Sequence, residues 1–259
     1  MNYALITGAS KGIGKAIAIE LAKRKHPVLL VARNETTLQK LANQIQQQFA
    51  VEAKYFAIDL SNPTAPQKLV DYCNENKFVI DILVNNAGYG LSGTIDKYTL
   101  IQHADMMQLN MYTPIALTYL LLPHLKQQSS AFILNVASSA AYQSVPGLNI
   151  YAASKAFILS FSRGLQYELK NSSVSVSVLS PGATDTDFAN RANVTSAKAQ
   201  KLAKQFNMQP HQVAKIGIDG MFAQKLEIVP GFVNKLGIVL AWLLPKKLLE
   251  KSAAGIYDL

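Results

Sequence analysis

Two short stretches of the sequence have residue types and spacings that can do chemistry. Residues 7–14 read TGASKGIG, a glycine-rich stretch between an apolar run and a helical-looking segment. Tyr151 and Lys155 are four residues apart, so in a helix their side chains lie on one face, about one turn apart. A free tyrosine has a pKa of about 10, and a nearby ammonium group lowers that pKa by stabilising the phenolate. The pair therefore predicts a general acid/base that works near neutral pH.

The glycine-rich stretch predicts a phosphate-binding turn. At a strand-to-helix turn, Gly8 can adopt backbone angles that other residues avoid. Gly12 and Gly14 would let the backbone approach a diphosphate at the helix N-terminus, which favours negative charge. The spacing G-x3-G-x-G differs from the common dinucleotide fingerprint, so an ordinary glycine turn remains the alternative for this stretch taken alone.

The elements that must position these residues alternate along the chain. Short apolar runs predict strands, with helical segments between them, at 3–7, 28–32, 54–58, 80–84, 131–136 and 174–179. This alternation predicts an α/β fold, a parallel sheet with helices on both faces. The segment VSVSVLS (174–180) alternates as a half-exposed strand would, but its small serines also fit beneath a covering helix, and we keep it in the sheet.

Composition narrows the classes of function. A length of 259 residues with 49% hydrophobic content suits one large core, and no repeat or linker divides the chain, so we predict a single domain over 1–259. The net charge of +9 suits phosphate-bearing ligands, nucleic acid or an anionic membrane. The lysines are scattered and no nucleic-acid motif is present, so we predict no nucleic-acid partner.

Cys73 is the only cysteine, which excludes an intramolecular disulfide and a thiolate metal cluster, and we predict no metal site. Met1 is followed by a strand-like segment rather than a signal sequence, so we expect a cytoplasmic protein.

Four further stretches extend the pattern. Asn85-Asn86-Ala87-Gly88 follows the fourth predicted strand, Asn110 lies in a helix, Ser138 follows the fifth strand, and Tyr151-Ala152-Ala153-Ser154-Lys155 opens the next helix. Together with TGASKGIG they closely resemble the short-chain dehydrogenase/reductase family, in order and spacing, over residues 1 to about 225. The resemblance implies a Rossmann-type doubly wound fold, a nicotinamide cofactor, and hydride transfer between that cofactor and a carbonyl or alcohol.

The resemblance also implies catalytic roles. Tyr151 matches the acid/base, and Lys155 matches its partner, which also reaches the cofactor ribose. Ser138 matches the hydroxyl that polarises the carbonyl, and we choose it over Ser139 because it lies 13 residues before Tyr151, the usual family interval. Asn110 matches the fourth position, which holds a helix distortion and a water that links the lysine to solvent.

The cofactor residues follow in the same way. At the end of the second strand, an acid would bind the 2′-hydroxyl of NAD and a basic residue would accept the 2′-phosphate of NADP. The sequence there is Val31-Ala32-Arg33-Asn34, so Arg33, helped by Lys11, predicts NADP(H), with two solvated surface charges as the alternative. The predicted cofactor residues are Gly8, Ser10, Lys11, Gly12, Ile13, Gly14, Arg33, Asn34, Asp59, Leu60, Asn86, Ala87, Gly88, Tyr151, Lys155, Pro181, Gly182, Thr184 and Thr186.

The substrate is less well defined. The resemblance places a lid at about 183–206, which here is polar and helical-looking. A pocket flanked by Ala140, Tyr142, Val145, Leu148 and Phe188 would favour an apolar, lipid-like carbonyl or alcohol, although core packing explains these residues equally well.

An apolar C-terminal extension at about 229–251 departs from the short end of many family members. The run from 238 to 244 is too short to span a bilayer, which needs about 20 apolar residues. One interpretation is a peripheral membrane contact through 232–251, which would make the protein membrane-associated. The alternative is a helix that packs over the substrate cleft or against a second subunit. A homodimer or homotetramer, packed through the helices with Asn110 and Tyr151, is implied by the resemblance.

We therefore predict an NADP(H)-dependent oxidoreductase acting on a carbonyl or alcohol. A non-catalytic dinucleotide-binding redox sensor is the alternative. Against it stands the complete set of Asn110, Ser138, Tyr151 and Lys155, because a sensor does not need all four.

Overall fold

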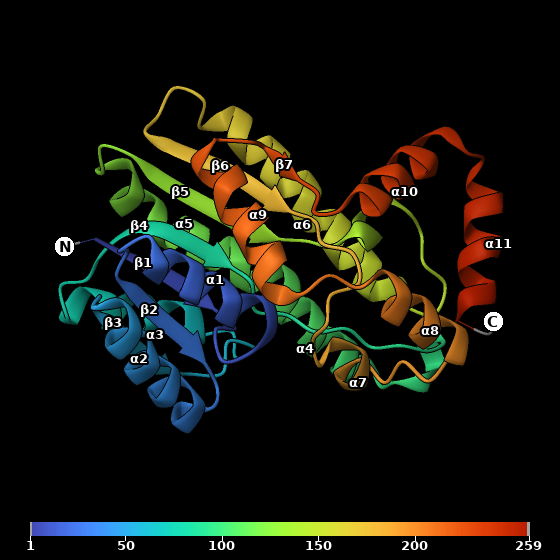
Figure 1. Cartoon of the computed structure of the whole chain (residues 1–259), viewed down its shortest axis with the longest axis horizontal. Coiled ribbons are helices and arrows are strands. Elements are labelled where there is room, and N and C mark those ends of the chain that lie inside the picture. The colour runs from blue at the N-terminus through green and yellow to red at the C-terminus, as the bar shows by residue number, and fades with distance from the viewer. Residues whose placement is uncertain (1, 258–259) are drawn as a thin grey trace.

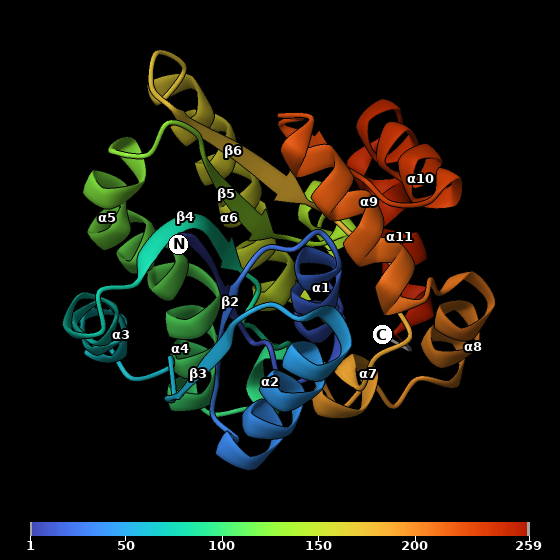
Figure 2. The same cartoon turned by 60° about the vertical axis from the view of Figure 1, so that its left-hand side comes forward.

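The computed structural model describes residues 2–257, in which one seven-stranded parallel sheet carries helices on both faces (Figures 1 and 2). The strand order is β3-β2-β1-β4-β5-β6-β7. The strands are β1 (Asn2–Thr7), β2 (Val28–Ala32), β3 (Ala53–Ala57), β4 (Val79–Asn85), β5 (Ala131–Val136), β6 (Val174–Leu179) and β7 (Glu227–Ile228). This arrangement confirms the predicted α/β doubly wound sheet.

Two apolar layers hold the helices on the sheet. Successive side chains of a strand point to opposite faces, so in β1 Ala4 and Ile6 enter one layer while Tyr3 and Leu5 enter the other. The first layer packs against α1 (Gly12–Lys23), α2 (Glu35–Phe49) and α9 (Pro210–Phe222). The second layer packs against α3 (Ala65–Glu75), α5 (Thr113–Lys126) and α6 (Asn149–Glu168).

Strand β6 settles the ambiguity of its alternating sequence. All six residues from Val174 to Leu179 are buried, because the strand lies between β5 and β7 and its serines are small enough to pack beneath helices. Strand β7 was not predicted, since two residues, Glu227 and Ile228, leave no periodic signal in a sequence.

The remaining elements gather at one end of the molecule. Between β4 and α5 lie the short helix η1 (Ile95–Lys97), α4 (Leu100–Met107) and a π-helix, η2 (Gln108–Tyr112). After β5 comes η3 (Ser139–Tyr142), and after β6 come α7 (Phe188–Arg191) and α8 (Ala197–Phe206). The chain ends in α10 (Phe232–Leu243) and α11 (Lys246–Ile256), which form a bent arm on the right of Figure 1.

Two negative findings apply to residues 2–257. No helix among them is both long enough and apolar enough to cross a membrane. No three histidine, cysteine, aspartate or glutamate side chains in this range are grouped to hold a metal ion.

Candidate active site

The predicted site residues meet at the carboxyl ends of the strands. In an open parallel sheet, ligands bind in the crevice where the strand order reverses, which here lies between β1 and β4. The glycine turn follows β1, and Asn86, Ala87 and Gly88 follow β4 on the other side of that crevice. Ser138 follows β5, and the loop that begins at Pro181 follows β6.

The glycine turn has the backbone angles that the sequence predicts. Gly8 and Gly12 have positive φ angles, +66° and +59°, which side chains rarely allow. Gly14 is closely packed, because a Cβ there would lie 2.4 Å from both Asn86 Nδ2 and Gly8 O. Its missing side chain therefore allows α1 to pack against the turn and β4.

The start of α1 fits a diphosphate. Lys11 occupies the N-cap without a capping side-chain bond, and the first turn contains no acid, so in the described chain the helix N-terminus keeps its positive character. Ser10 is partly exposed in the turn, and Ile13 is partly buried against the core. The turn thus combines available backbone N–H groups with close backbone approach, as phosphate binding requires.

Thr7 links the two sides of the crevice and was missed as a site residue. Its hydroxyl accepts hydrogen bonds from the backbone N–H groups of Asn86 and Ala87, both at 3.0 Å, and donates to Val84 O at 3.2 Å. The Asn86 amide in turn donates to Thr7 O at 2.8 Å. Thr7 opens the quoted stretch TGASKGIG, so its position was a usable signal.

Tyr151 is buried, and burial raises its pKa to about 12. The Ser138 hydroxyl lowers the pKa of Tyr151 and offsets part of that rise. The sequence predicted the opposite direction, a pKa lowered by Lys155. Desolvation of the phenolate is the larger effect in this structure.

Lys155 is also buried, one turn along α6. Its Nζ donates to Val136 O at 2.9 Å and lies 5.9 Å from the centroid of the Tyr151 ring. Burial lowers the pKa of Lys155 to about 8. The lysine therefore lies beside the tyrosine, as predicted, but its ammonium group is directed to the backbone of β5.

Asn110 lies in the π-helix η2, which is the helix distortion predicted for this position. Its carboxamide accepts from Tyr89 N–H at 3.1 Å and donates to Tyr89 O at 2.9 Å and to Ser154 Oγ at 3.0 Å. Ser154 donates to Tyr151 O at 2.7 Å. Asn110 thus connects the loop after β4 to the backbone of α6. Gly88 lies against it, since a Cβ there would be 2.8 Å from Asn110 Oδ1.

The two cations predicted to read the 2′-phosphate both have carboxylate partners. Arg33 lies 3.8 Å from Asp59 Oδ2, with both side chains at least half exposed, and Lys11 pairs with Asp187 at 2.5 Å. The Asn34 side chain accepts from Thr37 N–H and caps α2, which accounts for it without a ligand. Asp59 also accepts from Ser61, while Leu60 is buried and its carbonyl accepts from Thr113 Oγ1.

The loop after β6 is held by its own backbone. Pro181 O accepts from Ser139 N–H at 2.8 Å, next to Ser138. Thr184 O accepts from Thr186 N–H at 2.7 Å, and the Thr186 hydroxyl accepts from Phe188 N–H at 3.3 Å. A Cβ on Gly12 would lie 3.2 Å from Thr186 Cγ2, so this loop reaches the glycine turn. Gly182 packs against Asn234 of α10, where a Cβ would overlap the Asn234 amide.

An apolar wall surrounds Tyr151. Val145, Leu148, Ala140 and Phe188 belong to it as predicted, and the Phe188 ring centroid lies 5.1 Å from that of Tyr151. Tyr142 does not belong to it, because its hydroxyl donates to Glu227 Oε2 at 2.9 Å, away from the wall.

The end of the C-terminal helix completes this wall through two residues beyond the predicted extension at about 229–251. Ala253 and Tyr257 of the α11 end pack in the same cluster as Tyr151. Tyr257 lies directly on Gly147, where a Cβ would be 2.6 Å from Tyr257 Cβ, and Gly147 has a φ of +84°. The segment before α8 holds this end in place, since Ser196 Oγ donates to Ile256 O at 2.5 Å.

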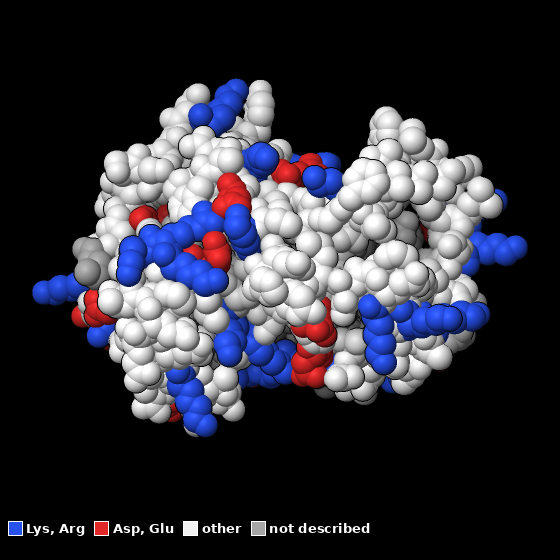
Figure 3. Space-filling model, in the orientation of Figure 1, with Lys and Arg blue, Asp and Glu red and all other residues white. Residues whose placement is uncertain are grey.

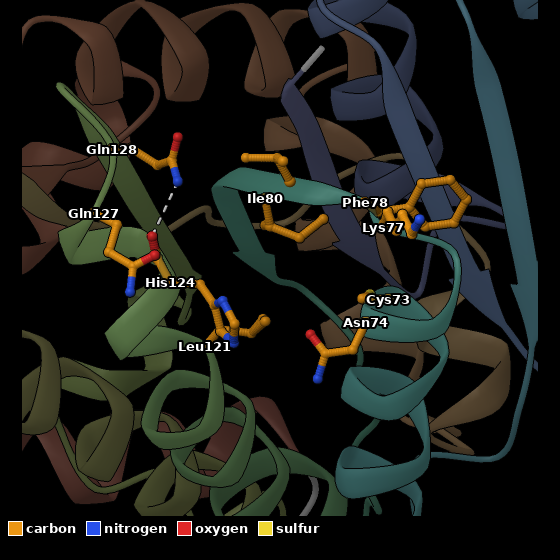
Figure 4. Close-up of a pocket in the computed structure, with 10 residues that line it drawn as sticks. Cys73, Asn74, Lys77, Phe78, Ile80, Leu121, His124, Gln127 and Gln128 are labelled. Atoms are coloured by element: carbon orange, nitrogen blue, oxygen red, sulfur yellow. Dashed lines mark hydrogen bonds between the residues drawn. The ribbon is translucent and has the colours of Figure 1, made fainter.

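A cavity of about 280 Å³ at the opposite end of the sheet is lined by none of the predicted site residues (Figure 4). It lies where α3 and α5 end and β4 begins, and its polar lining includes His124 and Gln128, of which Gln128 donates to His124 O at 3.1 Å. Cys73 is buried there, and burial raises the pKa of its thiol to about 12, so this cysteine is unreactive.

Comparison with known proteins identifies the family. The family model described as short chain dehydrogenase matches residues 2–219. The chain belongs to the short-chain dehydrogenase/reductase family. An uncharacterized oxidoreductase of Staphylococcus epidermidis (strain ATCC 35984) is 34% identical over 208 residues, which cover 78% of this chain and 87% of the relative. This short-chain dehydrogenase/reductase is therefore an oxidoreductase.

Two solved structures similar to this chain contain a nicotinamide cofactor. A short-chain dehydrogenase from Sphingobium yanoikuyae in complex with NADPH is 27% identical, with a TM-score of 0.82 over 100% of this chain and 95% of that one. A member from Burkholderia phymatum in complex with NAD is 24% identical, with a TM-score of 0.84 over 92% of each chain, and shares the fold. Short-chain dehydrogenases/reductases bind a nicotinamide dinucleotide, and the neighbours include both forms.

Proposed function

We propose that this chain is an NADP(H)-dependent oxidoreductase that interconverts a carbonyl and an alcohol by hydride transfer, with Tyr151 as the acid/base. The observation that carries this proposal is Tyr151, buried inside an apolar wall, with the Ser138 hydroxyl acting on its pKa and Lys155 one helical turn away. A proton donor and a second hydroxyl then converge on one position, as carbonyl reduction requires.

Each residue of the proposed site has its own role in the reaction. The bound nicotinamide supplies or accepts the hydride. In the direction of reduction, Ser138 donates a hydrogen bond to the substrate oxygen as charge develops there, and Tyr151 gives that oxygen its proton. Asn110 acts as a positioning residue through Ser154 and the backbone of Tyr151. The apolar wall excludes water from the reacting carbonyl.

Cofactor binding uses the crevice between β1 and β4. The N-terminus of α1 would hold the diphosphate, and Lys155 would bind the ribose. The adenosine half would be bound by Asp59, Leu60 and residues 86–88. Residues 181–186 would cover the nicotinamide, with Thr184 and Thr186 as the binding residues.

The preference for NADP(H) rests on Arg33. No acid stands at the end of β2, and Arg33 is exposed with a loose partner, so its guanidinium is free to take a phosphate bidentately. Lys11 supports it from the glycine turn.

The wall favours an apolar substrate. Its members near Tyr151 are Met106, Val145, Leu148, Phe188, Ala253 and Tyr257. We propose an apolar or lipid-like ketone, aldehyde or alcohol, because such a substrate loses little hydration on entering this wall.

We also propose that residues 1–259 work as one domain, and that two copies associate through α4 and α6. Leu100 and Ile101 are at least 80% exposed, and a groove of about 690 Å³ lined by Met107, Met111, Tyr112 and Phe157 lies beside them. An apolar surface of this kind suits a homodimer or homotetramer. Leu100→Glu is expected to yield monomers by light scattering, and an unchanged mass would contradict this interface.

A substrate screen tests the proposed function. Purified protein is mixed with NADPH or NADH and a panel of aldehydes, ketones and steroids, and nicotinamide absorbance is followed. Turnover with NADPH is expected. Tight cofactor binding with no turnover across the panel would favour the redox-sensor alternative.

A further inference from the structure

Helix α10 exposes its apolar side chains to solvent. Phe232 and Trp242 are 78% and 81% exposed. Seven further apolar residues of this arm are exposed by 40% or more, namely Val233, Leu236, Val239, Leu240, Leu243, Leu244 and Leu248. Exposed apolar surface of this density marks an interaction site in a folded protein.

The exposed residues form one stripe. Phe232, Leu236, Val239 and Leu243 recur at three- and four-residue spacing, so they lie along a single face of α10. Ala241 is the buried residue of the helix and lies on the other side. On that inner side Asn234 donates to Pro230 O at 2.7 Å and packs against Gly182. The helix is therefore anchored on the active-site loop with its apolar face turned outward.

Positive charge borders this stripe. Lys235, Lys246, Lys247 and Lys251 are exposed, and Glu250 is the one acidic residue of 229–251. In Figure 3 the surface over α10 is largely uncharged, with basic side chains along the outer edge of the arm.

We propose that the α10–α11 arm docks on an anionic lipid membrane. The apolar stripe enters the boundary between headgroups and acyl chains, Trp242 lies at the interface, and the lysines meet the headgroups. A second copy fits this surface less well, because a symmetric contact would bring the same four lysines of each copy together with Glu250 as the one acid of 229–251 to pair them.

The position of the arm connects the membrane to the site. Asn234 touches the loop after β6, and α11 continues from the docking face to Ala253 and Tyr257 in the wall around Tyr151. An apolar substrate dissolved in the membrane would therefore be concentrated next to the apolar wall around Tyr151. The docking proposal itself does not depend on any catalytic activity.

The single tryptophan of the chain lies on the proposed face, so its own fluorescence tests the proposal. The full-length protein is titrated with phosphatidylcholine vesicles that contain or lack phosphatidylglycerol. We expect a blue shift of Trp242 emission and co-sedimentation with the anionic vesicles, at least about tenfold stronger than with neutral vesicles and weakened by salt.

Two variants locate the contact. Leu236→Glu combined with Leu243→Glu is expected to abolish sedimentation. Tyr119→Glu, at a 76% exposed aromatic on α5, is the control and is expected to sediment as the wild type does.

The wild-type titration decides the proposal even if a variant misfolds. Absence of a shift with anionic vesicles overturns it, as does equal binding to neutral vesicles. A blue shift that grows with protein concentration in the absence of lipid also overturns it and assigns the face to a second copy.

Discussion

The ammonium group of Lys155 donates a hydrogen bond to Val136 O at 2.9 Å, while the ring of Tyr151 lies beside it with its centroid 5.9 Å away. Burial moves the two pKa values in opposite directions, raising that of Tyr151 to about 12 and lowering that of Lys155 to about 8. The protein alone therefore holds the phenol as a proton donor, and Lys155 changes charge slightly above neutral pH.

The buried lysine predicts a specific dependence of stability on pH. Its pKa is about 8 in the folded chain against 10.5 in the unfolded one, so between these values the unfolded chain binds more protons. Stability contributed by this site is therefore lowest below pH 8 and rises with pH through that window. Relative to Lys155→Met, the free energy of unfolding of the wild type is expected to rise by about 3 kcal/mol across it. Urea unfolding of both proteins at several pH values measures this, and a pH-independent difference would contradict the burial of a chargeable group.

Removing the tyrosine hydroxyl tests the acid/base assignment. Tyr151→Phe deletes one polar atom while keeping the packing against Phe188. Turnover is expected to fall about a hundredfold or more, because general acid catalysis is lost. NADPH binding, measured by fluorescence titration, should change little. Retention of more than about a tenth of the activity would remove Tyr151 from its assigned role.

Reversing the charge at Arg33 tests the cofactor preference. Arg33→Asp is expected to shift the ratio of kcat/KM values from NADPH towards NADH, since a carboxylate repels the 2′-phosphate and accepts a bond from the 2′-hydroxyl. Lys40→Asp, at an exposed position of α2, makes the same change in net charge and serves as the control. If both variants keep the wild-type ratio, Arg33 does not read the phosphate.

Truncating Tyr257 tests the C-terminal part of the substrate wall. The side chain packs on Gly147 and in the cluster around Tyr151, so Tyr257→Ala enlarges the space there. The kcat/KM for 4-phenylcyclohexanone relative to cyclohexanone is expected to rise about tenfold, and Tyr257→Phe should leave the ratio unchanged. An unaltered ratio in Tyr257→Ala would mean that the substrate does not reach α11.

Local sequence was sufficient for six of the seven strands and for the local conformation around the glycine turn and Tyr151. Apolar runs such as 28–32 and 131–136 are typical of strands that are buried on both faces of a sheet. Because these runs alternate with helical segments along the chain, the pattern predicts a parallel sheet. The glycine turn follows from backbone angles at Gly8 and Gly12, which are local properties of the chain. The spacing of Tyr151 and Lys155 likewise fixed their shared helix face.

Only the tertiary structure decided what depends on burial and on distant partners. The pKa of Tyr151 is set by desolvation, which depends on every element packed around it and not on the residue four positions away. The partners of Lys11 and Arg33 come from Asp187 and Asp59, and Tyr257 reaches the site through the course of α11. The apolar run at 238–244 has the same sequence whether its side chains face the core or the solvent. Hydrophobicity is a property of each side chain, whereas exposure depends on how the whole chain packs, so only the structure shows that this run is exposed.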